Sequence, residues 1–237
     1  MHERDRLSTG IAGLDEILDG GLIRERAYMV TGGAGTGKTI AGLHFLSEAI
    51  EAGEDALFVA FEEDPADLAD DAAGVGFDTS DITFLDLSPD AARFVDDQSY
   101  DVFEPDVVEG SGVAARIVEA VEATAPDRVF VDPLTHLQYL APDEYQYRQE
   151  VAGFVQYLTD AGATVLFSSQ AAVEGERATL EYLCDGSIRL DHAPKGRTIE
   201  VTKFRGSDFR SGAHTVRISD SGKIGRASCR ERVYCEV

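Results

Sequence analysis

The chain alternates between short apolar runs and longer amphipathic stretches over most of its length. Short apolar runs are typical of strands buried on both faces, and apolar positions three and four residues apart are typical of helices. The expected strands are Ala27–Thr31, Ala56–Phe61, Ile82–Leu87, Arg128–Asp132 and Ala163–Ser168. The expected helices are Lys38–Ala52, Pro65–Ala73, Val113–Ala125 and Glu144–Ala161. This alternation predicts an α/β fold with a mostly parallel central sheet flanked by helices.

The pattern changes in the last quarter of the chain. Ser187–His192, Thr198–Phe204 and His214–Ser219 read as successive strands separated by turn-rich stretches. They predict an antiparallel β extension at the C-terminal side of the sheet. Residues 88–112 are acidic and lack clear periodicity, so we expect a loop or an insertion there. No repeat of 20–50 residues is present, and a single domain is predicted.

The net charge indicates the salt conditions in which this protein is stable and the class of partner whose direct binding it disfavours. The 237 residues include 44 acidic and 21 basic side chains, a formal net charge of −23. Self-repulsion of this size destabilises a compact state in dilute buffer, and molar salt screens it beyond about 3 Å. We therefore hypothesise a salt-rich cytoplasm, with an ordinary acidic protein as the alternative. Direct nucleic-acid binding is disfavoured because no basic face is evident.

Localisation follows from what the sequence lacks. No apolar run approaches the ~18 residues of a membrane span, and the polar N-terminus does not resemble a signal peptide. A cytoplasmic protein without membrane contact is the expectation. The three cysteines show no metal-ligand spacing, so neither a zinc site nor a structural disulfide is predicted.

The last fourteen residues differ in composition from the rest of the chain. From Ile224 the sequence reads IGRASCRERVYCEV, with three arginines and two cysteines. This string resembles the translation of a common sequencing-adapter oligonucleotide. We therefore expect the domain to be residues 1–223 and residues 224–237 to be a non-native tail, with a genuine basic tail as the alternative.

A complete phosphate-loop motif follows the first strand. Residues 32–39 read GGAGTGKT and match G-x-x-x-x-G-K-[ST] between a strand and an amphipathic helix. Backbone N–H groups and the helix N-terminus favour phosphate oxygens there. Lys38 is predicted to reach the β- and γ-phosphates, and the Thr39 hydroxyl to complete a Mg²⁺ shell. The predicted nucleotide-binding residues are Gly32, Gly33, Ala34, Gly35, Thr36, Gly37, Lys38 and Thr39.

Carboxylates follow two other expected strands. Asp132 ends the run RVFVD, where a carboxylate can orient Mg²⁺ through its water shell, although aspartate also ends strands as a turn former. Glu62 and Glu63 follow the run ALFVAF at the carboxyl end of a strand, where open α/β sheets bind ligands. A carboxylate there can orient an attacking water and accept its proton. The two glutamates should point in different directions, and position alone leaves a solvated acidic turn open.

These segments together resemble the KaiC-type branch of the RecA superfamily of ATPases. The resemblance covers residues 6–223 and rests on STGIAGLDEILDGGL before the phosphate loop, FVAFEEDP, RVFVDPLTHL, EYLCDGSIRL and VTKFRGSDFRSG. It implies a RecA-like P-loop NTPase fold. Tandem domains, as in the clock protein itself, are not found in this chain. The autophosphorylation sites of the clock protein cannot be located in this sequence either, so a clock role is not supported.

The resemblance also implies residue roles. Glu62, with Glu63 beside it, would be the catalytic carboxylate, and Gln170 would sense the γ-phosphate. Lys203 and Arg205 match a K-x-R segment that reaches the neighbouring subunit's nucleotide, where cations stabilise transition-state charge. Their alternative is a plain strand-end pair that balances an acidic surface.

The expected function is slow, Mg²⁺-dependent hydrolysis of ATP by a homo-oligomer, either a ring or a filament. Such an assembly would act as a regulatory or signalling switch on a protein partner that the sequence does not identify. Two alternatives remain open. One is a recombination or repair accessory acting with single-stranded DNA or a recombinase, and the other is a nucleotide-binding scaffold with little turnover.

Overall fold

The computed structural model describes residues 5–88, 108–139, 141, 143–170, 180–194, 196–219, 222 and 224–226. Its strands are β1 (Arg6–Leu7), β2 (Leu22–Ile23), β3 (Ala27–Thr31), β4 (Ala56–Ala60), β5 (Thr83–Asp86), β6 (Arg128–Asp132), β7 (Thr164–Ser169), β8 (Gly186–Ala193), β9 (Gly196–Phe204), β10 (His214–Ile218) and β11 (Ile224–Arg226). Its helices are α1 (Ala12–Ile17), α2 (Lys38–Glu51), α3 (Pro65–Gly74), α5 (Val108–Thr124) and α6 (Glu144–Asp160), with a 3₁₀ helix η1 (Leu134–Tyr139). No helix in these ranges is long and apolar enough to cross a membrane.

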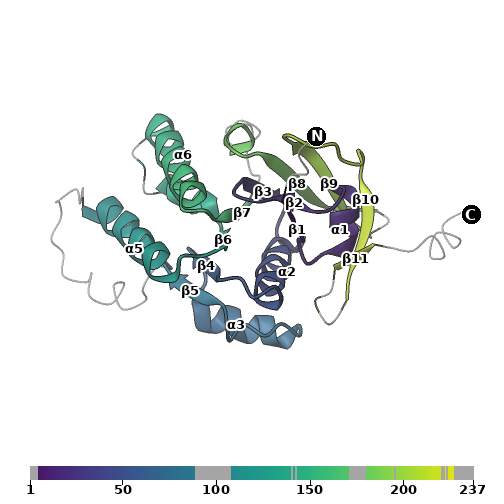
Figure 1. Ribbon diagram of the computed structural model, residues 1–237, viewed down its shortest axis with the longest axis horizontal. Helices are drawn as coiled ribbons and strands as arrows, with labels where there is room; N and C mark the ends of the chain where they lie inside the picture. Colours follow the sequence, from purple (N-terminus) through teal and green to yellow (C-terminus); the bar gives the residue numbers. More distant parts are fainter. Residues whose placement is uncertain are drawn as a thin grey trace, which may run out of the picture.

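The described strands other than β1 and β2 form one sheet in the order β11-β10-β9-β8-β3-β7-β6-β4-β5 (Figure 1). Strands β8, β3, β7, β6, β4 and β5 are parallel to one another, whereas the pairs β8–β9, β9–β10 and β10–β11 are antiparallel. The predicted α/β fold with an antiparallel C-terminal extension is therefore confirmed. Helix α5 begins at Val108 rather than at Val113, because the glycine-containing segment VEGSG hides the helical pattern.

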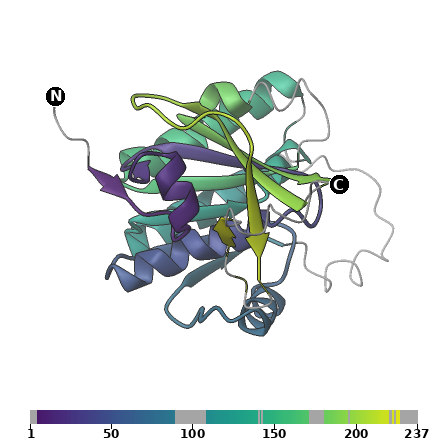
Figure 2. The same ribbon diagram turned by 90° about the vertical axis from the view of Figure 1, so that its right-hand side faces the viewer.

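Helices cover both faces of the sheet, and alternate strand residues supply the two cores. α2 and α3 lie on one face, and α5 and α6 on the other (Figures 1 and 2). Phe58 and Phe130 face α2, whereas Val59 and Val131 face the α5 and α6 side. Since successive strand side chains point to opposite faces, a strand covered on both sides must be apolar throughout. This explains the unbroken apolar runs in the sequence.

The N-terminal segment is fastened by its own polar residues and by one glycine. Asp15 Oδ1 accepts hydrogen bonds from the Thr9 backbone N–H at 2.8 Å and from Thr9 Oγ1 at 2.7 Å, and its Oδ2 accepts one from Ser8 Oγ at 2.8 Å. Gly10 has φ +74°, and a Cβ there would lie 2.4 Å from the His44 carbonyl oxygen of α2. The T-G-x-x-G-L-D segment thus seats the N-terminus against α2.

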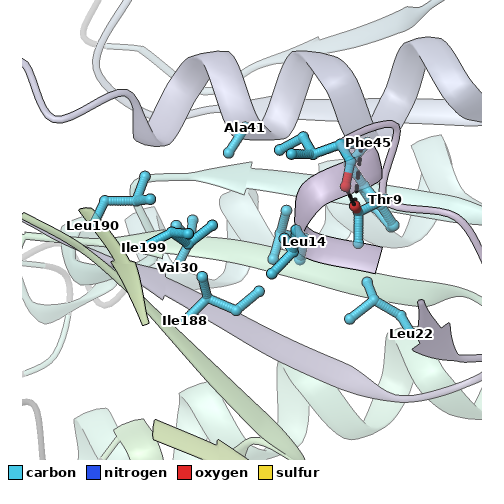
Figure 3. Close-up of a pocket in the computed structure, with 11 residues that line it drawn as sticks. Thr9, Leu14, Leu22, Val30, Ala41, Phe45, Ile188, Leu190 and Ile199 are labelled. Carbon is cyan, nitrogen blue, oxygen red and sulfur yellow. Dashed lines mark hydrogen bonds between the residues drawn. The ribbon is translucent and has the colours of Figure 1, made fainter. Parts of the chain in front are cut away.

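A small apolar cavity lies where this segment meets α2 and the sheet (Figure 3). Its lining comprises Thr9, Ile11, Leu14 and Leu22 from the N-terminal segment, Ala41 and Phe45 from α2, and Val30, Leu166, Ile188, Leu190 and Ile199 from the strands. Every one of these described residues except Thr9 is apolar, so the cavity offers nothing to a phosphate. It belongs to the packing of the core.

A network of ion pairs and hydrogen bonds surrounds the buried Arg128 side chain at the start of β6. The Arg128 side chain is 2% exposed, and its Nε donates to Glu54 Oε2 at 2.6 Å. Its Nη1 donates to the Ser8 carbonyl at 2.7 Å and to the Phe45 carbonyl at 3.2 Å. Arg24 pairs with the other oxygen of Glu54. A buried cation is tolerated here because carboxylate and carbonyl oxygens replace its water.

Two helical glycines provide a matched test of this packing. A Cβ at Gly42 of α2 would lie 2.2 Å from the Phe130 ring, whereas a Cβ at Gly153 of α6 meets nothing within 4 Å. We expect Gly42→Ala to lower the free energy of unfolding by about 1–3 kcal/mol through overpacking. Gly153→Ala should raise it by about 0.5–1 kcal/mol, since alanine is the better helix former. Urea unfolding of both variants measures this, and equal effects would contradict the helix–sheet contact.

The first three residues of the segment expected to be non-native take part in the sheet. Ile224–Arg226 form β11, which pairs antiparallel with β10 in the register Ile218↔Ile224. The Ile224 backbone N–H donates to His44 Nε2 at 3.1 Å. The foreign origin of residues 224–237 stays a prediction, which resequencing of the locus tests. Residues 227–237 lie outside the described part.

Candidate nucleotide-binding site

The carboxyl ends of four parallel strands meet at one edge of the sheet. In register, Thr31 of β3 pairs with Ser169 of β7, and Ala60 of β4 pairs with Asp132 of β6. The phosphate loop follows β3, the two glutamates follow β4, and Gln170 follows β7. Chain segments far apart in the sequence are thereby brought to the edge where open α/β sheets bind ligands.

Glycines shape the loop itself. Gly35 and Gly37 have φ of +71° and +105°, in the left-handed region that glycine enters without penalty. A Cβ at Gly32 would lie 2.4 Å from the Leu190 carbonyl oxygen of β8. Gly37 is the N-cap of α2 and makes no side-chain capping bond. The N-terminal N–H groups of α2 therefore have no side-chain cap and favour an anion.

Lys38 is the cation of the loop. It is 9% exposed, and its Nζ donates to the carbonyl oxygens of Gly32 at 3.0 Å and Gly33 at 3.1 Å. Burial lowers the pKa of the Lys38 ammonium, and the negative charges of Asp132 and Glu62 oppose that shift. The same ammonium therefore braces the loop and lies in the field of both carboxylates. An ammonium in this place can bind phosphate oxygens.

Hard oxygen donors lie beside the loop. Thr39 Oγ1 donates to Asp132 Oδ2 at 2.7 Å, and Ser168 Oγ donates to Asp132 Oδ1. Mg²⁺ is bound by one or two carboxylates together with waters and substrate phosphates, so this hydroxyl–carboxylate pair fits it. Among the residues that the structure describes, no group of three or more His, Cys, Asp or Glu side chains could hold a metal ion without such help.

Glu62 and Glu63 differ in their surroundings at the edge of the site. Glu62 Oε1 lies 3.9 Å from Nδ1 of His136 in η1, and its charge acts on Lys38. Burial raises the pKa of the Glu63 carboxyl, and the charges of Asp132, of Asp71 in α3 and of Glu62 raise it further. Both side chains are exposed at the edge of the site. Either can therefore meet a water near the loop.

His136 lies at the edge of this site, although no motif in the sequence singled it out. Its ring stacks on Phe61, with ring centroids 5.8 Å apart and an interplanar angle of 19°. The available signal was its place in the turn four residues after Asp132.

Gln170 is exposed directly after β7, at the same edge as the loop. Lys203 and Arg205 lie at the opposite edge, because β9 runs antiparallel to β8 and Lys203 pairs with Ser187 near the start of β8. Lys203 Nζ donates to the carbonyls of Glu181 and, at 2.6 Å, of Cys184. Arg205 is exposed, and its Nη2 donates to the Tyr182 carbonyl at 3.3 Å.

Sequence reasoning did not find Arg197, a charged residue that touches the phosphate loop. Nη2 of Arg197, in the second position of β9, donates to the Gly35 carbonyl at 3.3 Å. Only the order of strands in the sheet brings this end of β9 to the loop.

Comparison with known proteins gives matches over almost the whole chain. The profile of the KaiC ATPase family matches residues 7–225. The circadian clock protein KaiC3 of Synechocystis is 31% identical over 223 residues, which cover 88% of this chain and 43% of that protein. UPF0273 proteins of Methanopyrus kandleri and Pyrococcus horikoshii are 32% and 31% identical, and each match covers 92% of this chain and 90% or 93% of the relative. This chain thus spans less than half the length of the clock protein but almost the whole of the archaeal relatives.

Proposed function

The chain belongs to the KaiC family of ATPases, and we propose that it hydrolyses ATP with Mg²⁺ as a homo-oligomer that holds each nucleotide between two subunits. The observation that carries the proposal is the cluster at one sheet edge of a desolvated Lys38 and the hydrogen-bonded Thr39–Asp132 pair. Phosphate, Mg²⁺ and an attacking water each have a matching group there.

The residues of this edge divide the chemistry among them. The loop N–H groups and Lys38 bind the phosphates and stabilise charge that develops on the leaving β-phosphate oxygen. Thr39 and Asp132 would hold Mg²⁺, which draws electron density from the β- and γ-phosphate oxygens when it is bound. Glu62 or Glu63 orients a water whose oxygen bonds to the γ-phosphorus while the bond to the bridging oxygen breaks, and the carboxylate takes the water's proton. Gln170 completes the contact with the γ-phosphate.

Lys203 and Arg205 act on a neighbour's nucleotide in this proposal. They lie at the edge of the sheet opposite their own phosphate loop, so they can reach a nucleotide only in the site of a second subunit. Arg205 is exposed, and its planar guanidinium suits phosphate oxygens. Lys203 is tied to two carbonyls of its own chain and holds the segment that carries Tyr182 near Arg205. A ring or a filament satisfies this geometry, and its action as a switch on a protein partner is part of the proposal.

Light scattering and phosphate release on the same samples test this arrangement, in molar KCl because the net charge is −23. We expect ATP to promote assembly and the specific activity to rise with protein concentration. Arg205→Ala should lower kcat by roughly ten- to a thousandfold while ATP binding changes little, because the cation acts on transition-state charge from outside the loop. Full activity in a dilute, proven monomer would refute the shared site.

Two further results would redirect the proposal. Turnover unchanged by Glu62→Gln combined with Glu63→Gln would indicate a nucleotide-binding scaffold. Stimulation of hydrolysis by single-stranded DNA in molar salt would indicate a recombination accessory. We also propose a salt-rich cytoplasm as the setting, since the charge of −23 is best tolerated there.

A further inference from the structure

The antiparallel extension of the sheet touches the phosphate loop from outside. The Leu190 carbonyl of β8 backs onto Gly32, and Ile218 of β10 backs onto Gly37, where a Cβ would lie 2.6 Å from its Cδ1. Between them, Arg197 Nη2 of β9 donates to the Gly35 carbonyl at 3.3 Å. Of these three contacts, the one from Arg197 is made by a charged group.

Arg197 is held firmly in its place. Its backbone pairs with His192 of β8 on one side and with Val216 of β10 on the other. The side chain is half-buried, and its Nε N–H is buried with no hydrogen-bond partner among the described residues. Burying a guanidinium N–H without a partner is unfavourable. Packing in the core would therefore favour an apolar side chain at this position. The hydrogen bond to the loop carbonyl, by contrast, requires a donor such as arginine.

The contact acts on a peptide group of the phosphate loop. The Gly35 carbonyl and the Thr36 N–H belong to the same peptide unit, and that N–H makes only a long bond of 3.4 Å to the Gly33 carbonyl. A charged donor on the carbonyl oxygen polarises the unit and makes its N–H a stronger donor. It also holds the carbonyl away from the side where phosphate oxygens would repel it.

We propose that Arg197 is a positioning residue of the phosphate loop, which fixes the Gly35–Thr36 peptide with its carbonyl outward and its N–H available to nucleotide phosphates. This inference rests on the proposed function in one respect, since it requires nucleotide at the loop. Arg197 touches the loop rather than the reacting groups. It therefore contributes to the binding of ATP and ADP alike and leaves the chemical step unchanged.

Three variants of the full chain test the inference. Arg197→Met removes the donor, and Arg197→Lys keeps a charge that can donate one bond. Arg148→Met is the matched control, because it removes one positive charge from α6, where Arg148 pairs with an exposed Glu144. Dissociation constants for ATP and ADP are measured by displacement of a fluorescent nucleotide in molar KCl with Mg²⁺. kcat is measured at saturating ATP on the same preparations.

We expect Arg197→Met to weaken ATP and ADP binding by about tenfold each, with kcat within about twofold of the parent. Arg197→Lys should recover part of the affinity, and Arg148→Met should bind like the parent. Three results would each overturn the inference. They are an unchanged nucleotide affinity in Arg197→Met, an equal loss of affinity in Arg148→Met, and a fall in kcat of Arg197→Met without a change in its affinity. If Arg197→Met folds poorly, Arg197→Lys alone tests the inference. Its affinity for ATP and ADP should then be lower than that of the parent, and an affinity equal to the parent's would overturn the inference. A parent protein that binds no nucleotide would instead refute the proposed function.

Discussion

Replacement of Lys38 by methionine is expected to lower phosphate release by about a hundred- to a thousandfold and to abolish measurable ATP binding. The Lys38 ammonium is the buried cation of the loop, and methionine fills the same space without a charge or a donor. Phosphate release and equilibrium binding of a fluorescent ATP analogue measure the two losses. Arg148→Met, which removes a charge from α6, is the control and should behave like the parent.

Unfolding in urea separates loss of the site from loss of the fold. Without nucleotide, Lys38→Met should unfold within about 2 kcal/mol of the parent, because the loss of two hydrogen bonds to loop carbonyls is partly offset by the desolvation cost that the cation no longer bears. ATP at a hundred times its Kd should stabilise the parent by about 2.7 kcal/mol and the variant not at all. A variant that ATP still stabilises and that still hydrolyses it would show that the nucleotide binds elsewhere.

The largest expected effect on stability comes from Glu54→Gln. This change removes the negative charge that faces Arg128, whose side chain is 2% exposed, and leaves that cation uncompensated. Breaking one side of a buried pair typically costs about 3–5 kcal/mol. Urea unfolding in molar KCl at neutral pH measures the change. Arg24→Met is the milder comparison, because Arg24 is 34% exposed and Glu54 keeps its pair with Arg128.

The pH dependence of the same pair tests the cause. Burial raises the pKa of the Glu54 carboxyl, but hydrogen bonds from Arg24 and Arg128 outweigh it, so the pKa lies below its ordinary value of 4.5. The folded state then binds the proton less tightly than the unfolded state does. This stabilisation is fully present above pH 4.5 and is lost as the pH falls through the lower, folded pKa. The parent and Glu54→Gln should therefore differ most at neutral pH and converge in acid, and a constant difference would exclude the ion pair as its source.

Much of the fold follows from local patterns in the sequence. Ala27–Thr31, Ala56–Ala60 and Arg128–Asp132 form strands where apolar runs predict them, because a strand covered by helices on both faces must be apolar throughout. The loop at 32–39 could also be predicted from the sequence. A loop that wraps a phosphate group needs its glycines and Lys38 close together along the chain, so the motif is local. Asp132 was also predicted beside the loop, because it ends an apolar strand and the carboxyl ends of parallel strands share one edge. Gln170 was assigned from the family resemblance.

Contacts between elements far apart in the sequence could not be predicted in this way. Arg128 begins a strand and gives no sign that Glu54, 74 residues earlier, holds it in the core. His136 comes within 3.9 Å of Glu62 through the packing of η1 against β7 and α6. Arg197 reaches Gly35 across 162 positions because the sheet places β9 next but one to β3.

The sequence by itself therefore determined the fold class, the family and the phosphate loop, since each depends on the order and spacing of neighbouring residues. Tertiary structure alone decided which distant groups meet. It placed Lys203 and Arg205 at the edge opposite their own phosphate loop. The reason is that β9 runs antiparallel to β8, so the C-terminal end of β9 lies beside the start of β8. It also brought Glu62 within 3.9 Å of His136 in η1, because strand pairing and helix packing fix where side chains point, and no local pattern records that.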